Sequence, residues 1–181
     1  TKAIIAVHSF GHPADLDAIL EIAHNNNLKV IEDTAEAIAS KYKGSLCGTF
    51  GDVATFSLYA NKLVTTGEGG IIITNDDEIA SRARRYINLY FGSNERFSHE
   101  GLGFNFRMTN LQAAIGVAQI DKINEHAKKK LEIGSWYKKA LKDSKYFQFQ
   151  KSIGDIDHVY WMYTIIISDE LDIEGHELLS M

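Results

Sequence analysis

The pattern of hydrophobic and polar positions predicts buried strands connected by amphipathic helices. Residues 3–7 form an uninterrupted apolar run, which is typical of a strand buried on both faces. Apolar positions then recur at helical spacing over residues 16–23, after Asp15 as a candidate N-cap. A second apolar run at residues 28–31 completes a strand–helix–strand unit, in which we expect the two strands to be parallel.

The next part of the chain predicts two strands joined by a loop that carries a lysine. Residues 53–58 form an apolar strand candidate, Lys62 follows in a short turn, and a Thr/Gly-rich bend leads to an apolar run at residues 71–74. A lysine held between two strands is oriented as well as charged, and it can act as a nucleophile where its surroundings favour the neutral amine. The alternative is a flexible turn with a solvent-facing lysine.

Helical patterns dominate much of the remaining sequence. One helix is expected to begin after Asn75 or Asp76, and a longer one, capped by Thr109, is expected to continue in more polar form to about residue 141. Residues 91–106 lack periodicity, as functional or mobile loops do. The apolar run at residues 159–167 predicts another strand.

We interpret the chain as two units of an α/β protein. Residues 1–125 are expected to form part of a large domain, with a mostly parallel sheet flanked by helices. Residues 126–181 are expected to form a linking helix and the beginning of a small C-terminal α+β domain. Because a strand pattern starts at residue 3 and a helical pattern covers residues 173–181, we expect the sequence to be part of a longer polypeptide.

Charge and composition make several classes of protein improbable. A net charge of −5 at pH 7 gives no general attraction to nucleic acid or to an anionic membrane. No apolar run approaches the length of a membrane span, and no signal-peptide pattern is found. Cys47 is the single cysteine and cannot form an internal disulfide. These features favour a cytoplasmic protein.

Polar residues at the predicted strand ends suggest a cofactor site. Asp33 follows the strand at residues 28–31, and Ser57 and Lys62 belong to the next strand and its loop. Ligands of open α/β sheets bind outside the carboxyl ends of the strands. A lysine for a Schiff base, a carboxylate for a pyridinium nitrogen and a hydroxyl for a phosphate are the groups that pyridoxal 5′-phosphate (PLP) requires. The alternative for Asp33 is to cap a helix over residues 35–40.

Four separated blocks of sequence resemble the DegT/StrS-type nucleotide-sugar aminotransferases. The blocks are EDTAEA at residues 32–37, GDVATFS at 51–57, NK at 61–62 with TTGEGG at 65–70, and GFNFRMTN at 103–110 with QAAIG at 112–116. The resemblance extends from residue 1 to about residue 164 and includes His8 and Trp161. Within the family, the likeness is to enzymes that act on GDP-4-keto-6-deoxymannose.

The resemblance implies a PLP-dependent aminotransferase of fold type I that acts as a homodimer. Lys62 would hold the cofactor and, once displaced by an amino donor such as glutamate, would move a proton between the substrate carbon and the cofactor. Asp33 would pair with the ring nitrogen, Glu36 would lie near the ring hydroxyl, and Ser57 would bind the phosphate. Asn105 would reach the phosphate in the neighbouring subunit.

Each of these residues also has a structural alternative. Ser57 can be a small inward-facing strand residue, Glu36 a carboxylate at a helix start, and Asn105 a loop residue with unusual backbone angles. The Lys128–Lys130 run is interpreted as a solvated helix face. Three histidines without matching metal-ligand partners are interpreted as structural, and no metal site is predicted; they are His8, His12 and His24.

Other functions remain open from the sequence. A PLP-dependent sugar dehydratase on the same scaffold is one, although the dehydratases most like this family carry histidine at the position of Lys62. A non-catalytic chain that needs a partner chain is another. A nicotinamide-dependent oxidoreductase is disfavoured, because no Gly-x-Gly-x-x-Gly turn follows either early strand.

Overall fold

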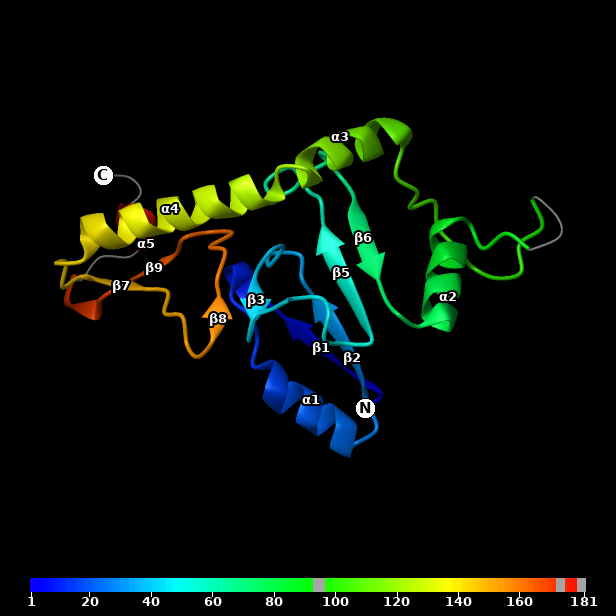
Figure 1. Cartoon of the computed structure of the whole chain (residues 1–181), viewed down its shortest axis with the longest axis horizontal. Coiled ribbons are helices and arrows are strands. Elements are labelled where there is room, and N and C mark those ends of the chain that lie inside the picture. The colour runs from blue at the N-terminus through cyan, green and yellow to red at the C-terminus, as the bar shows by residue number, and fades with distance from the viewer. Residues whose placement is uncertain (93–96, 172–174, 179–181) are drawn as a thin grey trace.

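The computed structural model describes residues 1–92, 97–171 and 175–178. Its centre is a four-stranded sheet in the order β1-β2-β5-β6 (Figure 1). Strands β1 (Ala3–Val7), β2 (Lys29–Asp33) and β5 (Val53–Ser57) are parallel, and β6 (Gly70–Ile73) runs antiparallel to β5. The predicted α/β class with a mostly parallel sheet is confirmed.

Helix α1 (Leu16–Asn25) connects β1 to β2 and completes the predicted parallel unit. The Asp15 carboxylate caps it by accepting a hydrogen bond from the Ala18 amide at 3.4 Å. Leu16 and Ala23 are the buried residues of this helix, and they lie two turns apart on one face. The helix therefore covers one side of the sheet with a narrow apolar stripe.

The prediction that β1 is buried on both faces is wrong for the described chain. Ala6 is buried, whereas Ile5 is 63% exposed and Val7 is 50% exposed. The reason is that α1 packs closely against β1 on one side, and no second helix of the described residues does so on the other. The uninterrupted apolar run therefore predicted the strand correctly, but only one face of the strand is buried.

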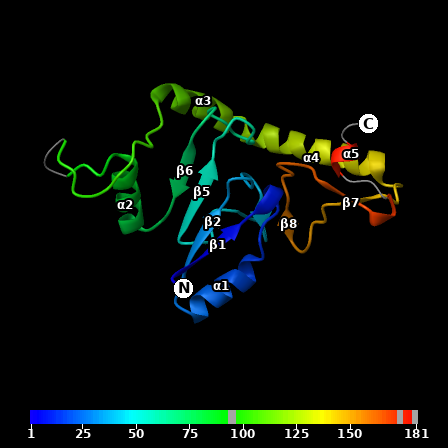
Figure 2. The ribbon, with the colours of Figure 1, turned by 180° about the vertical axis from the view of Figure 1, so that it is seen from behind.

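Three further helices follow β6: α2 lies beside that strand, whereas α3 and α4 follow one another along the long axis of the molecule (Figures 1 and 2). Helix α2 (Asp77–Ile87) is capped by Asp76, and α3 (Asn110–Ile120) begins with the capping box of Thr109. The predicted polar continuation is a separate helix, α4 (Ile123–Leu141), which follows a short break. No helix in the described ranges is both long enough and apolar enough to span a bilayer.

A small core lies beneath the loop that carries the predicted lysine. Ile38, Leu58 and Val64 are its buried members, and Met108 and Ile123 pack against it. These residues come from the turn after β2, the start and the middle of the lysine loop, the segment just before α3, and the start of α4. The core therefore fixes the loop against elements that are distant in sequence.

The strand predicted over residues 159–167 is much shorter than expected, since β9 covers only Ile165–Ile167. Tyr160 has a positive φ of 50°, which ends any extended run there. The Val159 amide donates to Ser40 Oγ at 3.4 Å instead of to a strand neighbour. Residues 158–161 are therefore a docked irregular segment, not a strand.

The remaining elements are short. Strands β4, β3 and β8 form one small sheet, and β7 pairs with β9. Because β8 pairs with β3, part of the predicted second unit lies against the first, and the division at residue 125 remains a prediction. Of the helix predicted over residues 173–181, residues 173–174 and 179–181 lie outside the described ranges. The bounds are β3 Lys41–Tyr42, β4 Ser45–Leu46, β7 Phe147–Phe149, β8 Ile156–Asp157, α5 Gly175–Leu178, and 3-10 turns at Ser9–Gly11 and Asp169–Leu171.

The segment between α2 and α3 folds back on itself and projects from the molecule (Figure 1). Isolated bridges align Asn88 with Asn105 and Phe91 with His99. Of the loop predicted at residues 91–106, residues 93–96 lie outside the described ranges. The non-periodic stretch is therefore an arm with its own internal pairing.

Candidate active site

Lys62 lies in the loop between β5 and β6, at the carboxyl end of the parallel strands. The Lys62 amide donates to the Tyr59 carbonyl at 3.0 Å, and the Thr66 amide donates to the Leu58 carbonyl at 3.0 Å. The Lys62 side chain is only 11% exposed. The alternative of a solvent-facing lysine is therefore wrong, whereas the bend does have glycines with positive φ, Gly67 at 80° and Gly69 at 147°.

The Lys62 amine lies between a carboxylate and an aromatic ring. Its Nζ is 4.0 Å from Glu36 Oε1 and 3.6 Å from the centre of the Trp161 ring system. The other Glu36 oxygen accepts a hydrogen bond from the Phe10 amide at 2.6 Å. The structure thus brings together Lys62 and Glu36, two of the predicted site residues, and adds Trp161.

Asp33 and Ser57 are the last residues of neighbouring strands β2 and β5. The strands are in register with Asp33 opposite Thr55, so the two side chains start from the same edge of the sheet. Asp33 Oδ1 accepts from the Ala35 amide at 3.1 Å, and no donor from the described residues reaches Oδ2. Because residues 35–40 form turns, the alternative that Asp33 caps a helix is wrong.

Asn105 is exposed on the projecting arm. Its Oδ1 accepts a hydrogen bond from Arg107 Nε at 3.0 Å, and its backbone is aligned with Asn88. These contacts lie within its own segment. Within one chain, the described structure does not join Asn105 to the other four predicted site residues.

A buried hydrogen-bonded pair of side chains, which the sequence analysis missed, lies beside Asp33. The side chains of His8 and Glu32 are fully buried, with His8 Nε2 3.1 Å from Glu32 Oε2. His8 Nδ1 accepts from the Ala14 amide at 3.0 Å, so the ring proton is on Nε2 and points at Glu32. Glu32 also accepts three backbone amides, each at 2.7 Å, from Gly48, Phe50 and Gly51.

Opposing effects act on the Glu32 carboxyl. Burial raises its pKa, but the hydrogen bonds from His8 and the three amides outweigh burial and leave the pKa below its ordinary value. Gly48 makes this arrangement possible, because its φ is +90° and a Cβ there would lie 2.5 Å from the Phe56 ring. Burial and the Glu32 charge also raise the pKa of the Cys47 thiol to about 12, so that thiol stays protonated.

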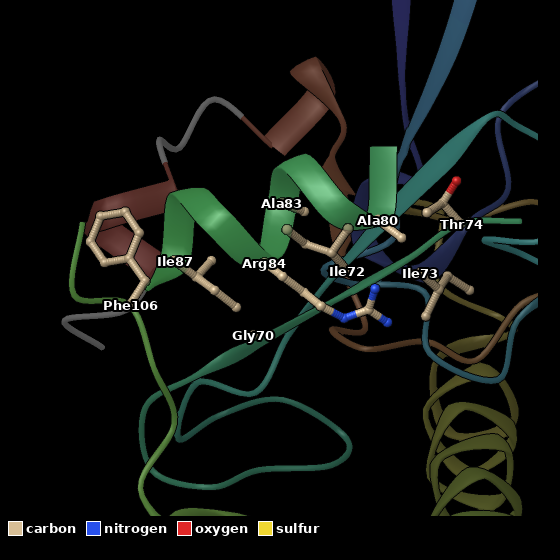
Figure 3. A pocket seen from close by; sticks show the side chains of 9 residues that line it. All are labelled: Gly70, Ile72, Ile73, Thr74, Ala80, Ala83, Arg84, Ile87 and Phe106. Carbon is tan, nitrogen blue, oxygen red and sulfur yellow. The ribbon is translucent and has the colours of Figure 1, made fainter. Parts of the chain in front are cut away.

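Two hollows differ in their relation to Lys62. One, of about 450 Å³, lies between β6 and α2, where Figure 3 shows Arg84 extending from the helix towards Ile73. No predicted site residue lines it. The other, of about 340 Å³, is lined by Lys62 together with His126 and Lys130 of α4. The second hollow is therefore the one that adjoins the candidate chemistry.

The fold and the position of the lysine define the class of protein. Helicobacter pylori PseC, an aminotransferase involved in the biosynthesis of pseudoaminic acid, superposes with a TM-score of 0.88 at 26% identity, over 94% of this chain and 47% of PseC. The architecture is that of the large domain of fold type I, PLP-dependent sugar aminotransferases.

The chain belongs to the DegT/DnrJ/EryC1/StrS aminotransferase family, whose profile matches residues 1–180. A GDP-perosamine synthase of Escherichia coli O157:H7 is 45% identical over 166 residues, which cover 92% of this chain and 45% of that protein. A GDP-perosamine synthase of Caulobacter vibrioides is 43% identical over 172 residues, covering 94% and 46%. The chain thus spans about half the length of these relatives.

Proposed function

We propose that the protein containing this chain is a PLP-dependent sugar aminotransferase. It would move an amino group from an amino acid, with glutamate as the expected donor, to a nucleotide-linked 4-keto-6-deoxy sugar. The observation that carries the proposal is the mostly buried Lys62 amine next to Glu36, at the sheet edge where Asp33 and Ser57 end their strands. GDP-4-keto-6-deoxymannose is the proposed substrate and GDP-perosamine the product, because the two GDP-perosamine synthases share 43% and 45% identity with the chain.

The side chains at this edge fit PLP. Lys62 supplies a primary amine that bonds an aldehyde carbon, and among the described residues it has no closer charged partner than Glu36 at 4.0 Å. Asp33 keeps one carboxylate oxygen without a donor from the described residues, which suits a protonated ring nitrogen. The Ser57 hydroxyl accepts from the Tyr59 amide at 3.3 Å, so its proton remains for a phosphate oxygen.

Bound PLP would act as an electron sink that makes the carbon–hydrogen bond of the amino donor acidic. Lys62 Nζ would take that proton and deliver it to another atom of the bound molecule, as a general base and then a general acid. Asp33 would hold positive charge on the ring nitrogen through its carboxylate. Glu36, fixed by the Phe10 amide, would keep a negative group beside the lysine amine.

The projecting arm supports a proposal of a homodimer with a shared site. Asn105 and the stacked rings of Phe104 and Phe106 are exposed on this arm, and one chain does not bring Asn105 to Lys62. If Asn105 serves the partner's site, mixing Asn105→Ala with Lys62→Ala subunits restores activity. Random mixing gives about half mixed dimers with one intact site each, hence about a quarter of the wild-type rate.

Mass by light scattering together with this rate checks the proposal. Native mass spectrometry of the mixture, in which the Asn105→Ala and Lys62→Ala subunits differ in mass, measures the yield of mixed dimers. A monomeric protein, or no activity in the mixture although mixed dimers have formed, contradicts a shared site.

The direct test of function is an assay of the whole protein with PLP, glutamate and GDP-4-keto-6-deoxymannose. The expected product is a 4-amino sugar nucleotide, detected by mass spectrometry, with one 2-oxoglutarate formed per amino sugar. A sugar product without nitrogen would indicate the dehydratase instead. If the amino group is transferred only to another nucleotide-linked keto sugar, the proposed aminotransferase activity stands and the proposed product, GDP-perosamine, is wrong.

A further inference from the structure

The Trp161 ring forms one wall around the free Lys62 amine. Lys62 Nζ lies 3.6 Å from the centre of the ring system, which is within the range of a cation–π contact. Trp161 is buried and Lys62 is mostly buried, so water competes little with the aromatic face. The contact therefore restrains the amine more firmly than an exposed contact of the same type would.

Trp161 is held by two hydrogen bonds, one from its ring nitrogen and one to its backbone carbonyl. Its Nε1–H donates to the carbonyl of Asn61, the residue before Lys62, at 3.0 Å. Its backbone carbonyl accepts from Lys130 Nζ of α4 at 2.9 Å. The ring thus follows any movement of the lysine loop, and the backbone is tied to the helix that leads into the second unit.

The segment before Trp161 is docked just as firmly. His158 Nε2–H donates to the Phe10 carbonyl at 3.1 Å, and Ser40 Oγ donates to the Gly11 carbonyl at 2.6 Å while accepting from the Val159 amide. Gly11 has a φ of +92°, and a Cβ there would lie 3.1 Å from the Trp161 amide. A residue with a side chain at position 11 would therefore push the segment away.

We propose that Trp161 is a positioning residue that gives the free amine of Lys62 a fixed resting place between the indole face and Glu36. The amine needs such a place whenever it is not bonded to a carbonyl carbon. The role in turnover rests on the proposed function, whereas the restraint on the amine does not. Docking of residues 158–161 would then be a condition for an ordered Lys62.

The first test measures how fast acetic anhydride acylates Lys62 in the cofactor-free protein, by peptide mass spectrometry with exposed Lys128 as internal reference. Trp161→Leu is expected to raise the relative rate at Lys62 roughly tenfold, and Trp161→Phe, which keeps an aromatic face, to change it less than about twofold. The matched control is Trp136→Leu, because Trp136 holds Lys129 at 4.5 Å on an exposed surface. It should leave Lys62 unchanged.

The Phe variant separates positioning from simple structural support. It lacks the N–H that bonds Asn61, so equal acylation of Lys62 in the Phe and Leu variants would show that the hydrogen bond matters and would overturn the proposal. An unchanged rate in a folded Trp161→Leu protein would overturn it as well.

A second measurement does not depend on a Trp161 variant. This chain has two tryptophans, so Trp136→Phe leaves Trp161 as its single indole emitter. In that background Lys62→Met should shift the emission maximum by a few nanometres, because a cation leaves the ring face, and Lys128→Met should not. No shift on Lys62→Met overturns the proposal.

Turnover provides the functional readout. Trp161→Leu should lower kcat for amino transfer about tenfold with little change in KM for the amino donor, and Trp161→Phe should retain most of kcat. If neither the acylation rate of Lys62 nor the emission of Trp161 changes as expected, the proposed positioning of the amine is wrong. If those effects are found and no amino transfer occurs with any keto sugar, the proposed function fails and the restraint on Lys62 stands.

Discussion

Lys62→Ala is expected to lower amino transfer by about four orders of magnitude or more, the scale seen when a residue that both bonds and moves protons is removed. Lys62→Arg should not rescue activity, because a guanidinium stays protonated and does not attack a carbonyl. The expected cost in folding stability is small, about 1 kcal/mol or less, since the charged partner that the described part of the chain offers the amine, Glu36, is 4.0 Å away. The initial rate of 4-amino sugar formation and the thermal midpoint measure the two effects.

Borohydride trapping identifies the bonded amine independently of turnover. After PLP is added and its bond to the protein is reduced with borohydride, the mass of a phosphopyridoxyl group is expected on the peptide that contains Lys62 and on no other lysine peptide. Lys128→Ala serves as the matched control, because Lys128 is an exposed lysine on α4. Trapping at a different lysine, or a Lys62→Ala protein that keeps more than about a hundredth of the rate, would contradict the assignment.

The local sequence pattern was sufficient to predict the parallel strands and the edge of the sheet at which the candidate site lies. Apolar runs located β1, β2 and β5, and the parallel connection placed the carboxyl ends of these strands together. Asp33 and Ser57 could therefore be predicted as neighbours from their positions at strand ends alone. The loop between β5 and β6 then limits where Lys62 can lie.

The contacts around the lysine amine could not be predicted in the same way. Trp161 bonds the carbonyl of Asn61 across 100 positions of sequence, and no periodicity relates such distant residues. The apolar run at residues 159–167 favoured a strand, but hydrogen bonds to Ser40 and Phe10 hold its first residues in an irregular segment. Tertiary docking overrode the local β propensity there.

The buried pair of Glu32 and His8 was missed for a related reason. Glu32 lies inside the motif that suggested Asp33, and a carboxylate in a strand gives no local signal that it will bind a histidine and three amides. His8 was interpreted as structural, and its hydrogen bonds show how it acts: it joins the Ala14 amide to the Glu32 carboxylate. Together, the pair ties the ends of β1 and β2 to the loop before β5.

Glu32→Ala is expected to lower the free energy of unfolding by about 3–5 kcal/mol, the range for breaking a buried charge-assisted network. The substitution leaves the His8 Nε2–H and three backbone amides without their acceptor, and the Glu32 side chain that accepted them is itself fully buried. Glu32→Gln should cost about 2–4 kcal/mol, because each carboxylate oxygen accepts two donors and an amide nitrogen in either position meets two of them. Urea unfolding at neutral pH measures both losses.

Asp52→Asn is the matched control for these losses. Asp52 also accepts a lysine and a backbone amide, at 2.6 and 2.8 Å, but its side chain is 29% exposed and water can replace a lost partner. We expect a loss of about 1 kcal/mol there. A Glu32→Gln protein within about 0.5 kcal/mol of wild type would contradict the role assigned to the network.

The pH dependence of stability gives an independent check on the same carboxylate. Because the pKa of Glu32 is lower in the folded than in the unfolded protein, its contribution is complete above the ordinary value of 4.5 and is lost as the pH falls through the folded pKa. The gap in unfolding free energy between wild type and Glu32→Gln should therefore narrow in acid. A gap that stays constant from neutral pH to well below 4.5 would show that shape, and not the charge held by His8 and the three amides, accounts for the loss.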